Sequence, residues 1–332
     1  MIPAMSDSYN DVAATTARGA DAGAGTGAGA TAALLAVGET MAMVAPFDGG
    51  RLANADQFRL DAGGAESNVA AHVAALGHRT AWFSRLGDDP LGHRVASQLA
   101  HRQVDVAAVV FDEQHPTGVY FKDPGHGVSY YRAGSAASRL SRADVDVVPL
   151  AGVRILHLSG ITAALSPSAA AFLDGIIDRA HTEGVLVSFD VNHRLALWDC
   201  ATAADILQFF ARRADLVFTG RDEAESLWGT VTPAEIRARF SDVPELVIKD
   251  GDIGATVYLA DAEFFEPSAV VDVVDVVGAG DAFAGGYLAA VFDGAPPPER
   301  LRAGHRRAAL TLRTTGDSIA EPTSQTNESV LQ

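Results

Sequence analysis

Short apolar runs alternate with helical patterns along most of this 332-residue chain, and this alternation limits the fold more than any other feature. Residues 185–190 suit a buried strand, whereas residues 168–181 have the apolar spacing of a helix. Apolar strands separated by helices are typical of a parallel sheet covered on both faces, so we expect an α/β fold. The predicted strands are 34–39, 80–84, 155–158, 185–190, 216–219 and 246–249, and the predicted helices are 65–76, 168–181, 202–212 and 233–240.

Two stretches, residues 46–62 and 117–133, interrupt this rhythm. Both resemble alternating β-structure, as in Thr-Gly-Val-Tyr-Phe-Lys at 117–122, and such alternation indicates strands with one face exposed. An antiparallel pair inserted into a parallel α/β chain needs a place outside the main sheet. We therefore expect a small β-sheet lid over the mouth of the main domain.

The two ends of the chain differ in composition from its body. Residues 1–33 are rich in Ala, Gly, Thr and Asp and lack the basic start and apolar core of a signal peptide. Such a composition buries too little apolar surface to offset the entropy lost on ordering. We expect a disordered tail at 1–33, a main domain at 34–322 and a flexible tail at 323–332.

Charge and cysteine content argue against several classes of partner. The formal net charge of −17 disfavours nucleic-acid binding, which needs clustered Lys and Arg. No stretch approaches the ~20 consecutive apolar residues that a membrane span requires. The single cysteine, Cys200, rules out an intrachain disulfide and favours a reducing cytoplasm. We expect a cytoplasmic protein with neither a nucleic-acid nor a membrane partner.

The strongest local signal is a Gly-rich loop near the C-terminus. The β-branched run at 271–277 predicts a strand, Gly278-Ala279-Gly280 predicts a turn, and residues 282–292 predict a helix. The glycines let backbone amides turn toward one point, where the helix start adds partial positive charge. This arrangement predicts an anion hole with Asp281 at its mouth.

Asp281 has a second interpretation, since Asp is also a common helix N-cap. The framing glycines and a second acid, Asp275, favour a functional role instead. The loop is not a P-loop, because the string Gly-x-x-x-x-Gly-Lys-Ser/Thr is absent. It also departs from a Rossmann fingerprint, because its third glycine is displaced to position 285.

Residues 275–281, Asp-Val-Val-Gly-Ala-Gly-Asp, resemble the Asp-Thr-x-Gly-Ala-Gly-Asp signature of ribokinase-like (PfkB) sugar kinases, with Val276 in place of Thr. The resemblance implies a ribokinase-like three-layer α/β/α domain with a small β-sheet lid, and ATP and Mg²⁺ as cofactors. It also implies that Asp281 is the base that accepts the proton of the attacking hydroxyl. Gly278, Ala279 and Gly280 would then stabilise the transferring phosphoryl group.

Further motifs extend the resemblance over roughly residues 34–320. Residues 62–70 resemble the Gly-Gly-x-x-x-Asn-x-Ala motif that holds sugar hydroxyls in this family, although a glycine pair before a helix also suits a plain tight turn. Residues 247–255 resemble the nucleotide-side strand and loop. The resemblance thus assigns substrate binding to Gly63, Gly64 and Asn68, and nucleotide binding to Lys249, Gly251 and Gly254.

One family motif is incomplete. Members usually carry Asn-x-x-Glu after the strand at 216–219, whereas this chain has Gly220 in place of the Asn and keeps the acid as Glu223. The resemblance implies that Glu223 contributes to nucleotide binding and acts on magnesium indirectly through water, because magnesium tends to retain several of its waters.

Two strings indicate the substrate. Residues 130–138 and 190–198 are similar to stretches of the family's kinases for 2-keto-3-deoxygluconate, a sugar acid whose carboxylate suits charge-assisted bonds from arginine. Taken singly, arginines at strand ends are usually solvated, paired tyrosines usually pack, and His157 suits a core histidine. The similarity assigns substrate binding to Tyr120, Tyr130, Arg132, Arg194 and Asp317.

The expected activity is therefore ATP-dependent phosphorylation of the 6-hydroxyl of 2-keto-3-deoxygluconate or its galactose-derived epimer. One alternative is a PfkB-family kinase for another sugar or sugar acid, such as fructose or ribose. Another, of a different class, is a non-catalytic sugar-acid sensor. Exposed lid strands would offer an edge for pairing, so we expect a homo-oligomer, a dimer or higher.

Overall fold

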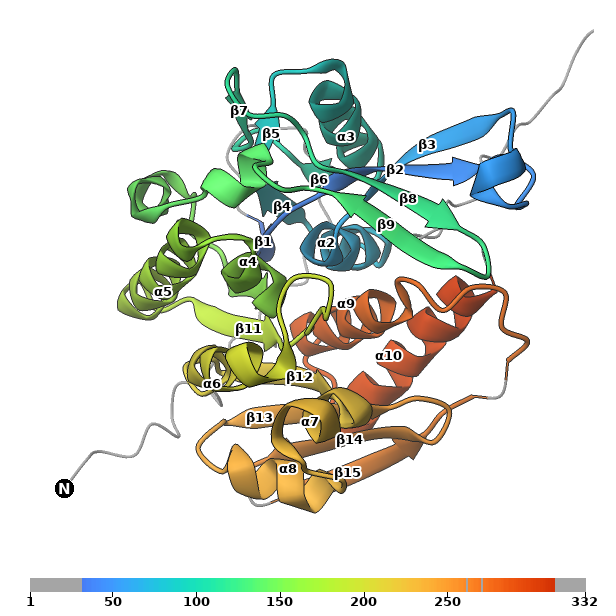
Figure 1. Ribbon diagram of the computed structural model, residues 1–332. Coiled ribbons are helices and arrows are strands. Elements are labelled where there is room, and N and C mark those ends of the chain that lie inside the picture. The colour runs from blue at the N-terminus through green and yellow to red at the C-terminus, as the bar shows by residue number, and fades with distance from the viewer. Residues whose placement is uncertain (1–31, 261, 270, 314–332) are drawn as a thin grey trace, which may run out of the picture.

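A nine-stranded sheet forms the centre of the protein in the computed structural model, which describes residues 32–260, 262–269 and 271–313. Its strand order is β15-β14-β13-β12-β11-β10-β1-β4-β6, and only β14 and β15 run antiparallel to their neighbours (Figure 1). The strands are β1 Leu34–Val37, β4 Thr80–Phe83, β6 Val104–Asp105, β10 Ile155–Ser159, β11 Leu186–Asp190, β12 Leu216–Gly220, β13 Glu245–Asp250, β14 Gly254–Leu259 and β15 Ala262–Pro267.

Helices cover both faces of this sheet. All four residues of β1 are fully buried, with Leu35 and Val37 in one core cluster and Leu34 and Ala36 in the other. This alternation is expected of a central strand with a helical layer on each side. The first cluster includes α4 Gly160–Leu165, α5 Pro167–Thr182, α6 Cys200–Ala211, α7 Arg221–Trp228 and α8 Pro233–Arg239; the second includes α2 Ala65–Ala75, α3 Pro90–His101, α9 Ala279–Phe292 and α10 Pro297–Leu312.

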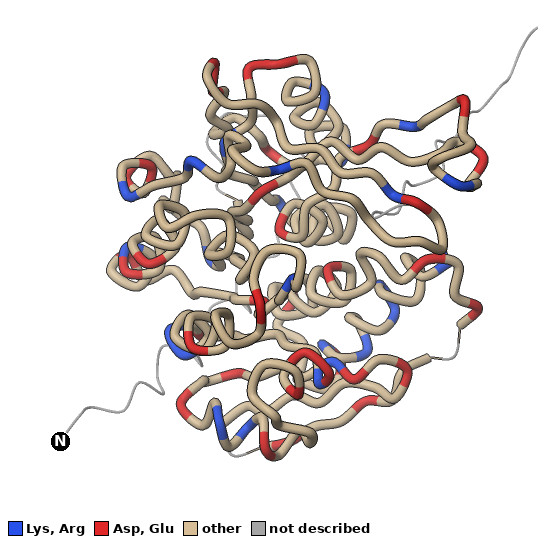
Figure 2. Tube along the Cα trace, in the orientation of Figure 1, with Lys and Arg blue, Asp and Glu red and all other residues tan. Residues whose placement is uncertain are grey.

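The three-layer α/β/α architecture, the mostly parallel sheet and the smaller separate sheet are thus confirmed. Within the described ranges, no helix combines the length and apolar character needed to span a membrane. Acidic and basic residues are interspersed along the chain (Figure 2). The tail predicted at 1–33 falls outside the described residues up to position 31, and the tail predicted at 323–332 falls outside them entirely.

The smaller sheet has the order β3-β2-β8-β9 and lies over the carboxyl ends of the main strands (Figure 1). Its strands are β2 Met41–Pro46, β3 Phe58–Gly63, β8 Val119–Asp123 and β9 Gly127–Tyr131. The hairpin β8–β9 falls within the predicted range 117–133. The other range, 46–62, is displaced, because β2 begins at Met41 and residues 47–57 form a connection with the 3-10 turn Leu52–Asn54. The apolar run at 41–46 lacks the alternation that would have marked it as a lid strand.

The predicted strand at 271–277 does not form, and this expectation was wrong. Its described residues lie in a loop, with Val273, Val274 and Val276 more than half exposed. Backbone bonds from Val274 and Asp275 to the carbonyl of Leu312, at 2.7 and 3.3 Å, tie the loop to the end of α10. β-branched residues favour strands mainly through packing against neighbours, and this loop has no such neighbours. Two short pieces, β5 Arg85–Gly87 and β7 Val110–Asp112, and the 3-10 turns Ala136–Arg139 and Arg142–Val147 complete the fold.

A buried charged network fixes α9 beneath the site. The fully buried carboxylate of Glu245, at the start of β13, accepts two bonds from Nη1 of Arg300 on α10, at 3.0 and 3.1 Å. The hydroxyl of Tyr287 on α9 also donates to Glu245. A buried ion pair is costly to break from one side, because the remaining charge stays in the low-dielectric interior.

We predict that Arg300→Met lowers the free energy of unfolding by about 3–5 kcal/mol, measured by urea denaturation followed by circular dichroism. Arg302→Met on the same helix is the matched control. Its exposed pair with Glu266, at 3.0 Å, should be worth less than about 1 kcal/mol. Equal small losses in both variants would show that the buried network is not needed for stability.

Candidate active site

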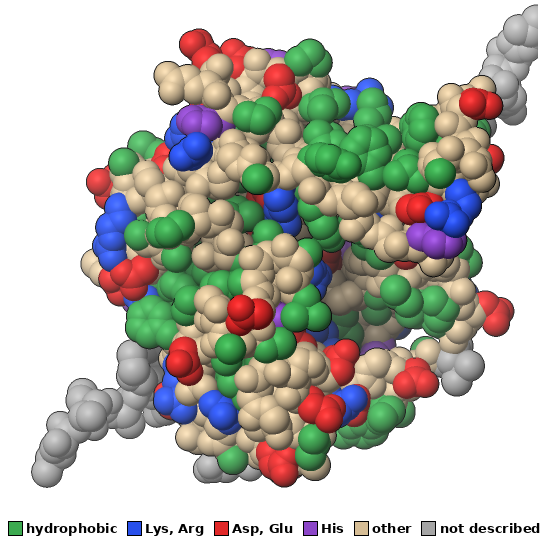
Figure 3. Space-filling view, viewed as in Figure 1, with side chains coloured by type: hydrophobic (Ala, Val, Ile, Leu, Met, Phe, Trp, Pro, Cys, Tyr) green, Lys and Arg blue, Asp and Glu red, His purple; other side chains and the backbone are tan. Residues whose placement is uncertain are grey.

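A cavity of about 620 Å³ lies between the lid and the carboxyl ends of the main strands, and it is visible as the hollow in Figure 3. Ligands of open α/β sheets bind at this end of the strands. The cavity is lined by Glu39, Met41, Gly63, Gly64, Ala65, Asn68, Tyr120, Val128, Tyr130, Arg132, Ile161, Asp190, Asn192, His193, Arg194, Leu195, Cys200, Gly220, Asp222, Glu223, Ser226, Lys249, Val276, Val277, Gly278, Gly280 and Asp281.

The N-terminus of α9 forms one wall. Gly278 is the N-cap and has φ +82°, a left-handed conformation that favours glycine. Gly278 and Gly280 line the cavity, where the first amides of a helix attract anions. Ala279, predicted to belong to the same anion hole, is not among the described lining residues, and its amide donates to the carbonyl of Val276 at 3.3 Å.

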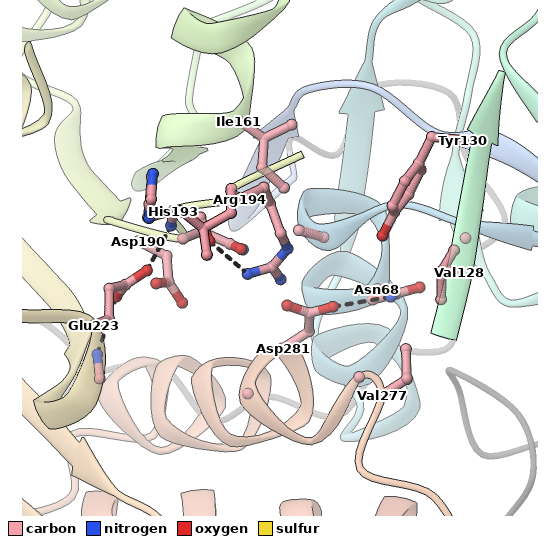
Figure 4. Close-up of a pocket in the computed structure, with 18 of the residues that line it drawn as sticks. Asn68, Val128, Tyr130, Ile161, Asp190, His193, Arg194, Glu223, Val277 and Asp281 are labelled. Atoms are coloured by element: carbon pink, nitrogen blue, oxygen red, sulfur yellow. Dashed lines mark hydrogen bonds between the residues drawn. The ribbon is translucent and has the colours of Figure 1, made fainter. Parts of the chain in front are cut away.

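Asp281 stands in the first turn of α9 rather than at its cap, so the structure does not support the N-cap interpretation. Its Oδ2 accepts a hydrogen bond from Nδ2 of Asn68 on α2, at 2.9 Å, and Arg194 lies on the other side (Figure 4). Burial raises the pKa of Asp281 to about 7, although the Asn68 bond and the Arg194 charge oppose the rise. A carboxyl group with that pKa is suited to accept a proton near neutral pH.

A second charged group lies at the ends of β11, β12 and β13. Nζ of Lys249 donates to Oδ2 of Asp190 at 2.8 Å. Burial lowers the pKa of Lys249, but the carboxylates of Asp190, Glu223 and Asp281 outweigh burial and raise it. Burial, followed by the Asp190 charge, raises the pKa of Glu223, which accepts bonds from the backbone of Gly220 at 3.1 Å and the hydroxyl of Thr219 at 3.2 Å.

The oxygen atoms near these charged groups are of the kind that binds magnesium. No cluster of three or more His, Cys, Asp or Glu side chains fit to bind a metal occurs among the described residues. Oδ1 of Asp190 and Oδ1 of Asn192 are buried without a hydrogen-bond partner, and carboxylate and amide oxygens are the ligands that Mg²⁺ accepts directly or through water. At Gly220 an added Cβ would lie 2.8 Å from Oδ1 of Asp222, so the Asp222 carboxylate occupies the space where a side chain at 220 would project.

Gly63 and Gly64, the two predicted substrate glycines, form another part of the cavity wall. An added Cβ at Gly63 would lie 2.0 Å from the hydroxyl oxygen of Tyr120, and one at Gly64 would lie 2.4 Å from the carbonyl oxygen of Glu39. Both contacts are closer than real Cβ atoms allow. Beside the glycine pair, lid strands β8 and β9 carry Tyr120 and Tyr130, with ring centroids 5.9 Å apart. Gly64 is therefore required for close packing against the backbone of Glu39, whereas a side chain at position 63 would displace the ring of Tyr120.

The two predicted substrate arginines have different surroundings. Arg132 is nearly buried and forms an ion pair with Glu39, a residue that the sequence reasoning missed. Arg194 is exposed, and its Nη1 donates to the carbonyl of His193 at 3.2 Å. The positive charge of Arg132 is therefore balanced inside the protein, whereas that of Arg194 faces the cavity.

Two predicted nucleotide-binding residues lie outside the described cavity lining. Gly251 lies in the turn between β13 and β14, and Gly254 is the first residue of β14. Asp317 lies outside the described residues. His157 is buried, with Nδ1 3.0 Å from the hydroxyl of Ser188, and burial lowers its pKa to about 4. It behaves as a neutral core histidine. Asp190 was missed as a site residue although it begins the string 190–198.

Known proteins match this chain over nearly its whole length. The family model described as "pfkB family carbohydrate kinase" matches residues 31–324. The chain is 36% identical over 307 residues to a 2-dehydro-3-deoxygluconokinase of Bacillus subtilis (strain 168), covering 89% of this chain and 94% of the relative. It is 33% identical over 309 residues to a protein of the same name from Thermoproteus tenax, covering 90% and 94%.

Solved structures of related proteins also align with most of this chain. The 2-dehydro-3-deoxygluconokinase of Thermotoga maritima aligns with a TM-score of 0.80 at 26% identity, covering 87% of this chain and 96% of that chain. A PfkB protein from Polaromonas sp. JS666 aligns with a TM-score of 0.78 at 32% identity, covering 84% and 95%. By sequence, by fold and by the polar cavity at the ends of its strands, this chain belongs to the pfkB family of carbohydrate kinases.

Proposed function

We propose that this kinase transfers the γ-phosphoryl group of ATP to the 6-hydroxyl of 2-keto-3-deoxygluconate or its galactose-derived epimer, with Asp281 as the base. The observation that carries the proposal is the position of Asp281, a carboxyl group with a pKa of about 7 in the first turn of α9, beside the Gly278 and Gly280 backbone. The 2-dehydro-3-deoxygluconokinases among its relatives support the choice of substrate.

Some residues of the chain orient the reacting groups, and others stabilise the negative charge of the phosphoryl group. ATP with Mg²⁺ supplies the phosphoryl group and part of the charge neutralisation. Gly278 and Gly280 direct backbone amides at the phosphoryl group, whose charge builds up in the transition state. Asn68 orients Asp281, which accepts the hydroxyl proton. The lid excludes water that would otherwise accept the phosphoryl group.

The nucleotide side is assigned to the group around Lys249. Glu223, Asp190 and Asn192 would hold the hydrated Mg²⁺, because all three line the cavity and the carboxylates of Glu223 and Asp190 lie close enough to interact. Lys249 balances these carboxylates and faces the nucleotide phosphates. Gly251, in the turn after β13, and Gly254, at the start of β14, would allow the nucleotide to approach the backbone.

The sugar acid is assigned to the lid side. Arg194 offers the exposed charge for its carboxylate, since charge-assisted bonds from a guanidinium are strong and geometrically specific. Glu39 holds Arg132 beside Tyr130, with Cζ of Arg132 5.6 Å from the ring centroid. Gly63, Gly64, Asn68 and the lid tyrosines would hold the hydroxyls, and Asp317 is proposed to complete this set.

We also propose that the enzyme acts in the cytoplasm as a dimer or higher oligomer. The outer face of the lid supports an assembly, because Phe58, Leu60 and Tyr131 of the lid strands are exposed. Hydrophobic side chains also gather over β2 and β8 in Figure 3. Cys200, the single cysteine, is unpaired, which suits a reducing compartment.

Asp281→Asn is predicted to lower kcat by about 10²–10⁴-fold, the usual contribution of a general base, in a coupled ADP-release assay. Thermal unfolding serves as the control for folding. Because the folded protein raises the pKa of Asp281 from 3.8 to about 7, the ionised carboxylate destabilises the fold above that range. The Asn variant should therefore be at least as stable as the wild type at pH 8. Substantial residual turnover would refute the base assignment.

The pH profile gives an independent prediction. With excess Mg²⁺ and saturating ATP, kcat/KM for the sugar should fall about tenfold per pH unit below an apparent pKa near 7, because only ionised Asp281 accepts the proton. This decrease at low pH should be absent from the residual activity of Asp281→Asn. An apparent pKa near the ordinary value for Asp would show that burial does not control the base.

Substrate preference tests the charge assignment. Turnover is compared over 2-keto-3-deoxygluconate, its galactose-derived epimer, gluconate, ribose and fructose, in the wild type and in Arg194→Met. A bond to a charged group contributes about 1.5–3 kcal/mol, so the variant should raise KM for the keto acids roughly 10- to 100-fold and leave neutral sugars nearly unchanged. If fructose or ribose is the best wild-type substrate, the assignment of a sugar-acid substrate fails, but the assignment as a sugar kinase remains.

A further inference from the structure

The chain has only two lysines, Lys122 and Lys249, and its other basic residues are arginines. Lys249 lines the cavity. Lys122 lies on lid strand β8, two residues after Tyr120 and therefore on the same, inward face of the lid sheet. Its side chain is buried, which is unusual for lysine. A buried charge needs a partner of opposite sign, and that partner comes from outside the lid.

One such partner is Asp275, in the loop that leads into α9. Nζ of Lys122 lies 3.1 Å from Oδ2 of Asp275, and the two residues are 153 positions apart in the chain. The other carboxylate oxygen, Oδ1, accepts the backbone N–H of Val277 at 3.0 Å. One carboxylate therefore bonds the lid with one oxygen and the turn before Gly278 with the other.

This loop has few other side-chain anchors. Val273, Val274 and Val276 are more than half exposed, so apolar packing holds the loop only weakly. Its backbone is bonded to the carbonyl of Leu312 at the end of α10. The Lys122–Asp275 pair adds a charged anchor on the lid side, where the β8–β9 hairpin meets the loop (Figure 1).

We propose that Lys122 and Asp275 are positioning residues that couple the lid to the phosphoryl-binding turn at Gly278 and Gly280. When the lid covers the sugar, Lys122 fixes the Asp275 carboxylate, which then fixes the Val277 amide and the turn that follows. The phosphoryl-binding amides are thus held in place only when the lid is down, and transfer to water is disfavoured. The inference rests on the proposed role of Gly278 and Gly280.

The position of the pair argues for action through the loop. Val276, Val277 and Gly278 line the cavity, whereas neither Lys122 nor Asp275 is among the described lining residues. The pair therefore lies behind the wall that the ligands would touch. Its loss should affect the geometry of the turn more than the binding of the sugar.

The test uses Lys122→Met, Asp275→Asn, the double variant and the conservative Lys122→Arg in the full-length enzyme. The two single variants should each lower kcat by about 10- to 100-fold, as displacements of about 1 Å do, while KM for the sugar changes less than about threefold. The double variant should be no worse than the worse single one, because both remove the same interaction. Lys122→Arg should restore most of the activity.

Hydrogen–deuterium exchange of the backbone amides at 271–283 gives a readout that does not depend on activity. Exchange there should be several-fold faster in Lys122→Met and Asp275→Asn than in the wild type. Arg51→Met is the matched control. Its exposed pair with Asp123, the next residue along β8, joins Nε and Oδ1 at 3.4 Å. Asp123 also accepts the backbone N–H of Leu52 at 2.8 Å, so the pair anchors residues 51–52, and its loss should leave both exchange and kcat unchanged.

The other outcomes overturn the coupling. Additive losses in the double variant would mean that the two residues act separately. A higher KM for the sugar with unchanged kcat would make Lys122 a substrate ligand. Faster exchange with wild-type kcat would make the pair structural only. If the wild type phosphorylates no sugar tested, the proposed substrate fails on its own, and exchange still decides the pair, because unchanged exchange in both variants overturns it.

Discussion

The placement of α9 against the sheet and its neighbouring helices determines where the chemistry can occur. The helix is buried along nearly its whole length, and small residues allow close approach on two sides. An added Cβ at Gly285 would lie 2.5 Å from Cβ of His72 on α2, and one at Gly286 would lie 2.5 Å from the carbonyl oxygen of Ala303 on α10. Glu245, Arg300 and Tyr287 fix the same helix through buried charge. The N-terminus of α9, with Asp281, is held at the mouth of the cavity for this reason.

The electrostatic potential in the cavity is set by nearby charged groups rather than by the net charge of the protein. The net charge of −17 would repel ATP and a sugar acid at long range, but screening limits that field to about 8 Å at physiological salt. Within the cavity, Lys249 balances Asp190, and Arg194 faces the opening. Burial also raises the pKa of Asp281 to about 7 and that of Glu66, near Arg132, to about 7. Near neutral pH these two carboxyls are partly protonated, so the local negative charge is smaller than the sequence count suggests.

Sequence patterns predicted most of the strands of the central sheet, whose residues are buried on both faces of the sheet. The strands at 155–158 and 216–219 were found because each is a short, mostly apolar run, and strands of a parallel sheet that is covered on both faces have this pattern. The strand at 271–277 was wrong for a related reason: a β-branched run describes a preference for packing, and here the chain provides no partner strand. Helix α10 went unpredicted because its polar residues, several of them arginine, obscure the narrow apolar stripe that packs against α9.

Contacts within the site were likewise predicted only in part. Asp281 and Asn68 are 213 positions apart, and only family motifs could suggest that they meet, since no local pattern carries such a contact. The pairs Arg132–Glu39 and Lys122–Asp275 were beyond sequence reasoning, because they depend on how the lid sits on the main domain. Motifs indicate which groups perform chemistry, but the fold decides which charges remain available for a ligand. Arg132 and Arg194 look equivalent in the sequence, yet the first is balanced inside the protein by Glu39 and the second faces the cavity. Under the proposed assignment, substrate discrimination would therefore depend on an acid in the turn between β1 and β2 as much as on the arginines themselves.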